Sequence, residues 1–265
     1  MNERFIASGF TCIEENPAGF QLWQNDQGLM MVALNNPPVN SLSRALITAL
    51  DTTLKELEQA PPKALIWTST NPRVFSAGLD VKELIDPDET AFKSYWAAFE
   101  SLWKTSYLFP SPTVAMLAGA APAGGTVLAL CCDYRYATSR TKLGLTEVAI
   151  GMVPPQWLIA MAERTLGPRQ AELVLQGGQV LAAPEALDVG YIDAIVEPDE
   201  ILARCIAQAE QFAQTPATVR AETKRRQRSA VADFIGPTSV DAMWAQIPHD
   251  PFQSQLKAMM ARLKK

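Results

Sequence analysis

Residues 119–135 read GAAPAGGTVLALCCDYR and follow the apolar run TVAMLAG at 113–119. The apolar run predicts a buried strand, and the small residues after it predict a loop that turns into a buried helix. A short strand is predicted next, near 133–138. A strand, a loop, a helix and a second strand in this order are typical of an α/β protein.

The same alternation extends in both directions along the chain. GFQLWQNDQGLMMVALNN (19–36) predicts two strands joined by an Asn-Asp-Gln-Gly turn. Further elements are expected at 41–60 (helix), 61–70 (strand), 88–108 (helix), 155–166 and 168–177 (helices) and 192–196 (strand). We therefore predict an α/β core over 1–197 and a helical region over 198–265, whose apolar periodicity requires it to pack on the core or on another subunit.

Composition limits the class of protein. A chain of 265 residues that is 48% hydrophobic suits one large globular domain, alone or with a smaller appendage. Its net charge of −5 disfavours a general nucleic-acid or membrane-surface binder, which is more often basic. The one basic cluster, KRRQR at 224–228, is either a solvated helix face, which we favour, or a phosphate-binding patch. No apolar run approaches the roughly 20 residues that cross a bilayer.

The cysteines and the histidine narrow the chemistry. Cys12, Cys131, Cys132 and Cys205 have no metal-ligand spacing, and the start MNERFIASGF carries no signal or transit features. We interpret the cysteines as reduced core thiols of a cytoplasmic protein. The single histidine, His249, is expected in a surface loop. With one histidine in the sequence, a metal site built from several histidines is disfavoured. No G-x-S-x-G motif accompanies it to suggest a serine hydrolase.

Two segments of small residues share one design. FSAGLD (75–80) and GAAPAGGTV (119–127) each follow a strand and lead into a helix, where unpaired N–H groups carry positive partial charge. Two such loops that converge form an oxyanion hole around one carbonyl oxygen, although glycines that only permit tight turns explain either loop alone equally well. Neither loop matches a nucleotide-binding motif. Asp80 and Glu83 have the spacing of a capping box.

GLTEVAIGMVPP (144–155) contains a single carboxylate, Glu147, in an apolar stretch rich in glycine and proline. A buried carboxylate without a partner is unfavourable, because desolvation disfavours its charged form. Such a residue either lies at the wetted edge of an element or is the reagent of an active site. Apolar neighbours would raise its proton affinity and strengthen it as a base. The neighbours expected to do so are Leu145, Val148, Ile150 and Val153.

Five segments, in their order and spacing, resemble the crotonase superfamily, also called enoyl-CoA hydratase/isomerase. They are NPPVNSLS (36–43), VFSAGLDVKEL (74–84), GAAPAGGTVLALCCDYR (119–135), GLTEVAIGMVPPQW (144–157) and APEALDVGYID (183–193). The nearest likeness within it is to the Δ3,Δ2-enoyl-CoA isomerases of mitochondrial type. The resemblance implies a crotonase-type α/β spiral of ββα units and C-terminal helices that assemble homotrimers or dimers of trimers.

The resemblance also implies the ligand and the site. The substrate would be an acyl-CoA thioester, with no separate cofactor, no metal, and neither nucleic acid nor membrane as a partner. The thioester carbonyl would accept bonds from the amides of Leu79 and Gly124, and Glu147 would be the base. The remaining substrate contacts implied are Ser76, Ala77, Gly78, Asp80 and Thr146, with Val39 and Lys82 near the CoA.

Two positions separate the reactions of the superfamily. Hydratases resemble one another in having two glutamates, which divide the activation of water and the transfer of a proton. Here the first position is Val127 and the second is Glu147, so a single base remains. One base suffices for a 1,3-proton shift, and we expect an isomerase that converts 3-enoyl-CoA to trans-2-enoyl-CoA in fatty-acid β-oxidation. The alternatives are a hydratase, a thioester hydrolase or a decarboxylase, and, from a different class, an RNA-binding or scaffold protein of the same fold.

Two features leave the shape of the acyl pocket open. Thr146 stands where the mitochondrial-type isomerases often have asparagine, and Pro154 and Pro155 follow. Aromatic side chains either bound such a pocket or fill the core, and the core is the commoner place for them. This choice applies to Trp96, Trp103 and Trp157.

Overall fold

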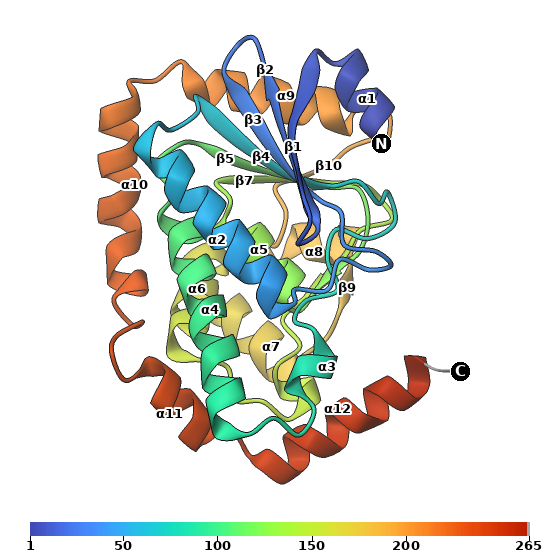
Figure 1. The fold of residues 1–265 in the computed structure, drawn as a ribbon, viewed down its shortest axis with the longest axis vertical. Coiled ribbons are helices and arrows are strands. Elements are labelled where there is room, and N and C mark those ends of the chain that lie inside the picture. The colour runs from blue at the N-terminus through green and yellow to red at the C-terminus, as the bar shows by residue number, and fades with distance from the viewer. Residues whose placement is uncertain (264–265) are drawn as a thin grey trace.

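A computed structural model describes residues 1–263 and contains two β-sheets surrounded by helices (Figure 1). Residues 264 and 265, the end of the predicted helical region, lie outside the described residues. The larger sheet has the order β1-β2-β3-β4-β5-β7-β10. Its strands are β1 (Phe10–Asn16), β2 (Phe20–Asn25), β3 (Leu29–Leu34), β4 (Ala64–Ser69), β5 (Thr113–Leu117), β7 (Tyr134–Ala137) and β10 (Ala194–Ile195).

The first three strands of this sheet are antiparallel, and the strands from β3 to β10 run parallel. The hairpin predicted within 19–36 is confirmed as β2 and β3. β1 was not predicted, because its alternation is obscured by polar residues on an edge strand. The α/β class predicted from the sequence is confirmed.

The helices occupy most of the predicted positions. They are α1 (Asn2–Ala7), α2 (Arg44–Gln59), α3 (Val81–Leu84), α4 (Glu89–Leu108), α5 (Gly124–Cys131), α6 (Gln156–Leu166), α7 (Pro168–Gly177), α8 (Ala183–Asp188), α9 (Ile201–Ala213), α10 (Ala217–Ala232), α11 (Ser239–Gln246) and α12 (His249–Leu263). Side-chain caps begin two of the longest: Ser43 accepts the Leu46 amide at α2, and Asp88 accepts the Ala91 amide at α4. No described helix is long and apolar enough to span a membrane.

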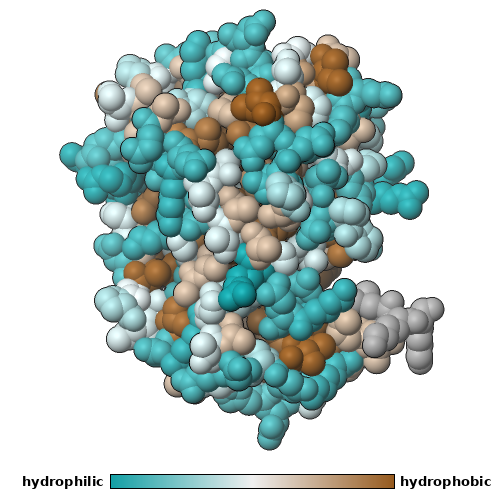
Figure 2. Space-filling view, viewed as in Figure 1, coloured by the Kyte–Doolittle hydropathy of each residue, from teal (hydrophilic) through white to brown (hydrophobic). Residues whose placement is uncertain are grey.

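The central strands β3 and β4 of the larger sheet are buried on both faces, which explains their continuous apolar sequences. Alternate residues of β3 point to opposite sides. Met31 packs on the side of α1 and α9, whereas Val32 packs on the side of α2, α4 and α5. In Figure 1 α9 lies along one side of the sheet and α2 and α4 along the other. The face drawn in Figure 2 is mostly hydrophilic, with small scattered hydrophobic groups, one of them beside the C-terminal end of α12.

A second, smaller sheet was missing from the sequence prediction. It pairs β6 (Ala121–Pro122) in parallel with β8 (Lys142–Gly144), which pairs antiparallel with β9 (Leu181–Ala182). Strands of two or three residues carry no readable period. The sheet matters because it joins the second small-residue loop to the segment that carries Glu147.

The capping box predicted for Asp80 and Glu83 is wrong. Asp80 does cap α3, since its carboxylate accepts the amide of Lys82 at 3.0 Å. Glu83 instead accepts the amide of Arg44 at 2.9 Å, at the start of α2. The glutamate therefore links two helices rather than closing its own.

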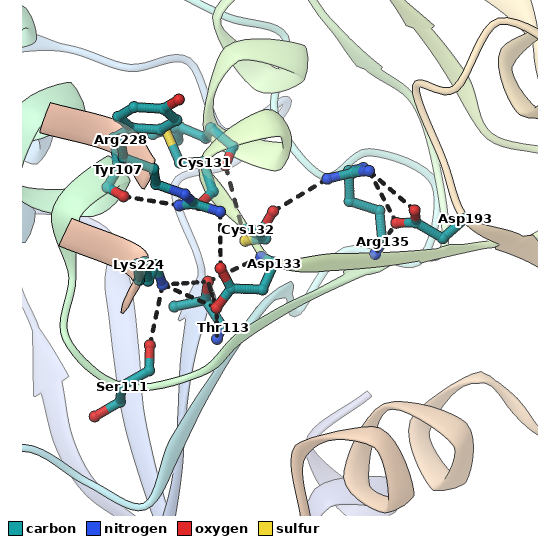
Figure 3. Close-up of polar contacts among 11 residues, drawn as sticks. Tyr107, Ser111, Thr113, Cys131, Cys132, Asp133, Arg135, Asp193, Lys224 and Arg228 are labelled. Carbon is teal, nitrogen blue, oxygen red and sulfur yellow. Dashed lines mark hydrogen bonds and ion pairs between the residues drawn. The ribbon is translucent and has the colours of Figure 1, made fainter. Parts of the chain in front are cut away.

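The predicted solvated face of KRRQR is wrong for two of its residues. Lys224 and Arg228 are buried and reach Asp133 at 2.8 and 2.7 Å (Figure 3). Burial opposes the ionisation of Asp133, but the two cations outweigh it and hold its pKa below the ordinary value. Arg225 and Arg226 do face solvent. The cluster thus anchors α10 to the start of β5 and the start of β7.

Two minor predictions need correction. Cys131, Cys132 and Cys205 are buried free thiols, whereas Cys12 on β1 is partly exposed and is not a core thiol. His249 is at the surface, but it begins α12 instead of lying in a loop, and its ring packs edge-on against Trp244. The division of the chain at residue 197 stays a prediction.

Candidate active site

A cavity of about 370 Å³ lies where the two small-residue loops, the glutamate segment and helices α4, α6 and α12 meet. Leu79 and Gly124 line it from the two loops, and Glu147 lines it from the third segment. Its wall is mainly apolar. The structure therefore brings together the three residues singled out from the sequence as base and amide donors.

The first loop is held from behind by a set of hydrogen bonds. The amide of Leu42 donates to the carbonyl of Gly78 at 2.8 Å, and the hydroxyl of Tyr95 donates to the carbonyl of Leu42. The same hydroxyl accepts the amide of Asp80 at 2.9 Å. The amides on either side of Leu79 both have acceptors, because Gly78 donates to the Ser76 hydroxyl and Asp80 donates to the Tyr95 hydroxyl. Within residues 1–263 the amide of Leu79 itself has no acceptor.

The second loop is held by the smaller sheet. The amide of Ala123 donates to the carbonyl of Gly144 at 2.8 Å, and the amide of Gly144 donates to the hydroxyl of Thr126 at 2.8 Å. Ala123 has a φ of 52°, a region that a side chain disfavours, and it immediately precedes the first residue of α5. That residue is Gly124, whose amide likewise has no acceptor in the described part of the chain.

The two loops touch at their glycines. A Cβ atom on Gly124 would lie 3.2 Å from the Cα of Gly78 and 3.3 Å from the backbone nitrogen of Leu79. Two free amides at such closely packed loops form the arrangement that an oxyanion hole requires.

Glu147 is buried, and its Oε2 atom has no hydrogen-bond partner within residues 1–263. The residue precedes a single 3-10 turn, η1 (Val148–Ile150), whose tight path lets the amide of Met152 donate to the carbonyl of Glu147. Burial raises the pKa of the Glu147 carboxyl to about 7. A carboxyl with this pKa exchanges protons readily near neutral pH, as a general base must.

The apolar surroundings of Glu147 differ in part from those predicted. Leu145 is buried and Ile150 lines the cavity, as expected. Val148 and Val153 are each 46% exposed and do not supply the apolar environment. Side chains remote in the sequence contribute to that wall instead, among them Val127 of α5, Trp157 and Leu158 of α6, and Leu256 of α12.

The other predicted contact residues divide into two groups. Ala77 and Thr146 line the cavity, and Gly78 lies immediately behind it where the loops touch. The residues outside the lining are Ser76, Asp80, Lys82 and Val39. Their contact with a substrate stays a prediction.

Those residues have visible roles or positions in the loop. The buried hydroxyl of Ser76 donates to the carbonyl of Asn40 at 2.7 Å and accepts the amide of Gly78 at 3.1 Å. Asp80 caps α3, as described above, while Lys82 and Val39 are exposed nearby. Ser76 and Asp80 thus shape the loop through bonds within the protein.

The tryptophans combine the two roles that the sequence left open. Trp96, Trp103 and Trp157 are all buried in the core, and Trp96 and Trp157 also line the cavity. Trp103 packs behind Trp157 with the ring centroids 4.5 Å apart.

Three supporting residues escaped the sequence analysis. Tyr95, Thr126 and Asn40 hold the loops through hydrogen bonds to distant backbone groups. Their only sequence signal is a polar side chain at an otherwise apolar helix or loop position, which does not identify the partner.

The arrangement has a definite chemical capacity. A proton acceptor of raised pKa faces the same apolar cavity as two unpaired amides, so the site can remove a proton next to a carbonyl and stabilise the resulting oxyanion. Among the described lining residues Glu147 is the one acid, and the side chain of Val127 in the same wall is apolar. Within residues 1–263, no three His, Cys, Asp or Glu side chains are grouped to hold a metal ion.

Comparison with known proteins identifies the family. The family model described as enoyl-CoA hydratase/isomerase matches residues 24–253. The mitochondrial enoyl-CoA delta isomerase 1 of mouse is 35% identical over 89% of this chain and 84% of its own. A probable enoyl-CoA hydratase of Mycobacterium tuberculosis is 31% identical over 75% of this chain and 76% of its own.

A solved structure extends the comparison to the fold. The crystal structure of human mitochondrial Δ3,Δ2-enoyl-CoA isomerase superposes with a TM-score of 0.88 and 34% identity. The match covers 92% of this chain and 98% of the human one. The chain therefore belongs to the enoyl-CoA hydratase/isomerase family and has the crotonase fold.

Proposed function

We propose that the protein is a Δ3,Δ2-enoyl-CoA isomerase of fatty-acid β-oxidation. The observation that carries the proposal is that Glu147, whose Oε2 has no partner, is the one carboxyl among the described residues that line the cavity, while Val127 stands at the position of the second acid of hydratases. The identity to the mouse and human isomerases supports the same choice.

The reaction begins with proton transfer to Glu147. Its carboxylate removes a proton from C2 of a 3-enoyl thioester, and the electron pair moves into a dienolate whose charge rests on the thioester oxygen. The amides of Leu79 and Gly124 donate to that oxygen. Loss of one such donor typically costs about 3 kcal/mol of transition-state stabilisation.

The second step returns the same proton. Protonated Glu147 delivers it to C4, the C2–C3 double bond forms, and the conjugated trans-2-enoyl product results. C2 and C4 flank one carbon, so one carboxyl placed over the chain reaches both. The apolar cavity excludes water from the dienolate and keeps the proton on the carboxyl between the two steps.

The hydratase is the competing reaction, since one relative carries that name. It requires a water held and activated beside C3, and the apolar side chain of Val127 offers that water no hydrogen bond. An RNA-binding role is disfavoured because half of the cations in KRRQR are buried against Asp133. The proposals of a homotrimer or dimer of trimers and of a reaction without a separate cofactor rest on the sequence resemblance. The proposal of a cytoplasmic location rests instead on the cysteines, which have no metal-ligand spacing.

One experiment separates these reactions. The purified protein is mixed with a trans-3-enoyl-CoA of medium length, and conjugation is followed by ultraviolet absorbance while mass spectrometry checks the product. Conjugation without a change of mass supports the isomerase. A gain of one water indicates a hydratase, and release of free CoA indicates a hydrolase. No reaction with any 3-enoyl-CoA contradicts the proposal.

A further inference from the structure

A second buried carboxyl, Glu100 of α4, lies next to the cavity without entering it. Its Oε1 atom accepts the indole N–H of Trp96 at 3.0 Å and that of Trp157 at 3.1 Å. Its Oε2 atom accepts the hydroxyl of Ser239 at 2.6 Å. No basic side chain pairs with it in the described part of the chain. Glu100 thus ties α4, α6 and α11 together through two indoles and a hydroxyl.

The two indoles belong to the wall of the cavity. Trp96, Phe99 and Trp157 all line it, and all are at most 3% exposed. Other lining residues, Ala149 and Val180, are exposed. The exposed residues mark the open side of the cavity, whereas the three aromatic residues belong to its buried wall, together with Val127, Leu158 and Leu256. The aromatic part of this wall is called the closed end.

The closed end is a continuous set of edge contacts. Phe99 meets Trp96 with centroids 5.7 Å apart at 65° and meets Trp157 at 6.0 Å and 62°. Such edge-to-face contacts tolerate several ring orientations, and they do not by themselves fix the indoles. The hydrogen bonds to Glu100 fix the two indoles, because each indole has a single donor, its N–H group, and that donor is bonded to Glu100.

A carboxyl suits this position for a specific reason. Two buried indole N–H groups meet at one point, and a carboxylate oxygen has enough acceptor capacity for both. An apolar residue there would leave both donors buried and unpaired, and the indoles would turn to find other acceptors. The closed end of the cavity would then move.

We propose that Glu100 is a positioning residue that holds Trp96 and Trp157 as the closed end of the acyl cavity and thereby sets the longest acyl chain the enzyme accepts. The inference rests on the proposed function, since the ligand concerned is the acyl chain of a 3-enoyl-CoA.

Four variants test the role. Glu100→Met keeps the length of the side chain and removes the acceptor. Glu100→Gln keeps an amide oxygen for the indoles and is the conservative rescue. Ser239→Ala removes the bond to Oε2, together with the contact of the same hydroxyl to the Gly236 carbonyl at 2.9 Å, and leaves both indole bonds in place, so it is the matched control. Glu100→Asp withdraws the carboxyl by one methylene and carries the test if the methionine variant does not fold.

The measurement is kcat/KM for 3-hexenoyl-, 3-decenoyl- and 3-tetradecenoyl-CoA. In Glu100→Met the ratio of the longest to the shortest substrate should rise about tenfold, the lower end of the discrimination that one methylene in a hydrophobic pocket gives. Glu100→Asp should show a smaller rise, and Glu100→Gln and Ser239→Ala should keep the wild-type ratio. An equal loss for all three substrates in both the methionine and aspartate variants would mean that Glu100 only stabilises the fold, and the proposal would be wrong.

The wild-type enzyme separates this inference from the proposed function. If it isomerises 3-enoyl-CoA but the ratio never changes among the variants, only the role of Glu100 is overturned. If it has no isomerase activity, the same comparison is made by calorimetric titration with hexanoyl- and tetradecanoyl-CoA. A shift of relative affinity toward the longer chain in Glu100→Met would still support the role, and the absence of any acyl-CoA binding would overturn both.

Discussion

A Cβ atom on Gly78 would lie 2.8 Å from the backbone nitrogen of Gly124, closer than side-chain carbons come to backbone atoms in real proteins. Gly78 has a φ of 90°, which also favours glycine. The contact between the two loops therefore depends on the absence of a side chain at this one position. It lets the loops that carry the Leu79 and Gly124 amides lie in contact at the cavity.

Gly78→Ala should reduce kcat/KM for a 3-enoyl-CoA by about a hundredfold or more, since the added methyl group displaces the Gly124 amide that donates to the oxyanion. The matched control is Gly236→Ala, where an added Cβ meets nothing within 4 Å and activity should stay at the wild-type level. Steady-state kinetics with both variants check the prediction. If Gly78→Ala keeps wild-type activity, the two loops do not stabilise the oxyanion.

Glu147→Gln should fold, bind acyl-CoA and lose activity by a factor of about a thousand, within the usual range for removal of a general base. The amide has nearly the shape of the carboxyl but cannot take up the C2 proton. Absorbance at the conjugated thioester band measures turnover, and calorimetry measures binding. Substantial turnover in this variant would sink the single-base mechanism.

The pKa of Glu147, raised to about 7, predicts a rising limb in the pH profile of kcat/KM. The carboxylate is the active form of the free enzyme, so activity should increase tenfold per pH unit below about 7 and level off above it. The profile should be measured at substrate concentrations far below KM. A midpoint near the ordinary glutamate pKa would show that Glu147 is not the group being titrated.

The same shift predicts a stability difference of a definite sign. Between the ordinary pKa of 4.5 and the folded value of about 7, the folded protein holds a proton that the unfolded chain has lost. Stability contributed by the protonated carboxyl is therefore present below 4.5 and is lost as pH rises toward 7. Relative to Glu147→Gln, the wild type should lose up to about 3 kcal/mol of unfolding free energy across this window, as urea titrations would show.

The sequence predicted the fold best where elements are long and depend on local signals. α2 and α4 follow the N-cap residues Ser43 and Asp88, whose short polar side chains are typical of helix starts. The hairpin turns at an Asn-Asp-Gln-Gly sequence, which is typical of turns. The smaller sheet escaped prediction because β6 and β9 have two residues each. Strands this short are defined by their hydrogen bonds to neighbouring strands and not by a pattern in their own sequence.

The residues of the candidate site could be predicted where they belong to a local motif. Glu147, Leu79 and Gly124 were identified because they belong to local motifs, and they do line one cavity. The hydrogen-bond and ion-pair partners of Glu83 and Lys224 were not predicted, because a polar side chain on a helix can bond either within its own helix or to a residue far away in the sequence. Asp133 is 91 residues from Lys224, and no local pattern connects them. Likewise, the exposed Val148 and Val153 could not be told from cavity residues by their apolar character.

Arg228→Met should destabilise the protein by about 3–5 kcal/mol, because Asp133 would lose one of the two buried cations that pair with it. Urea unfolding at neutral pH measures this loss. At urea concentrations well below the unfolding midpoint the enzyme activity should be unchanged, since Arg228 lies outside the cavity. The control is Arg226→Ala on the exposed side of the same helix, which should leave the midpoint in place. Equal effects of the two substitutions would contradict a structural role specific to the buried cations.

Val127→Glu addresses the choice between isomerase and hydratase directly. Val127 lines the cavity and is 1% exposed, so a glutamate there would place a second carboxyl beside the substrate in an apolar wall. The burial should lower the stability, and the second acid should allow water to be held and activated next to C3. We expect measurable hydration of trans-2-enoyl-CoA, detected as a product one water heavier, together with a slower double-bond shift. Val127→Gln, of similar size but unable to act as a base, is the control and should hydrate nothing. If the glutamate variant folds and binds acyl-CoA but adds no water, the valine is not what separates the two reactions in this protein.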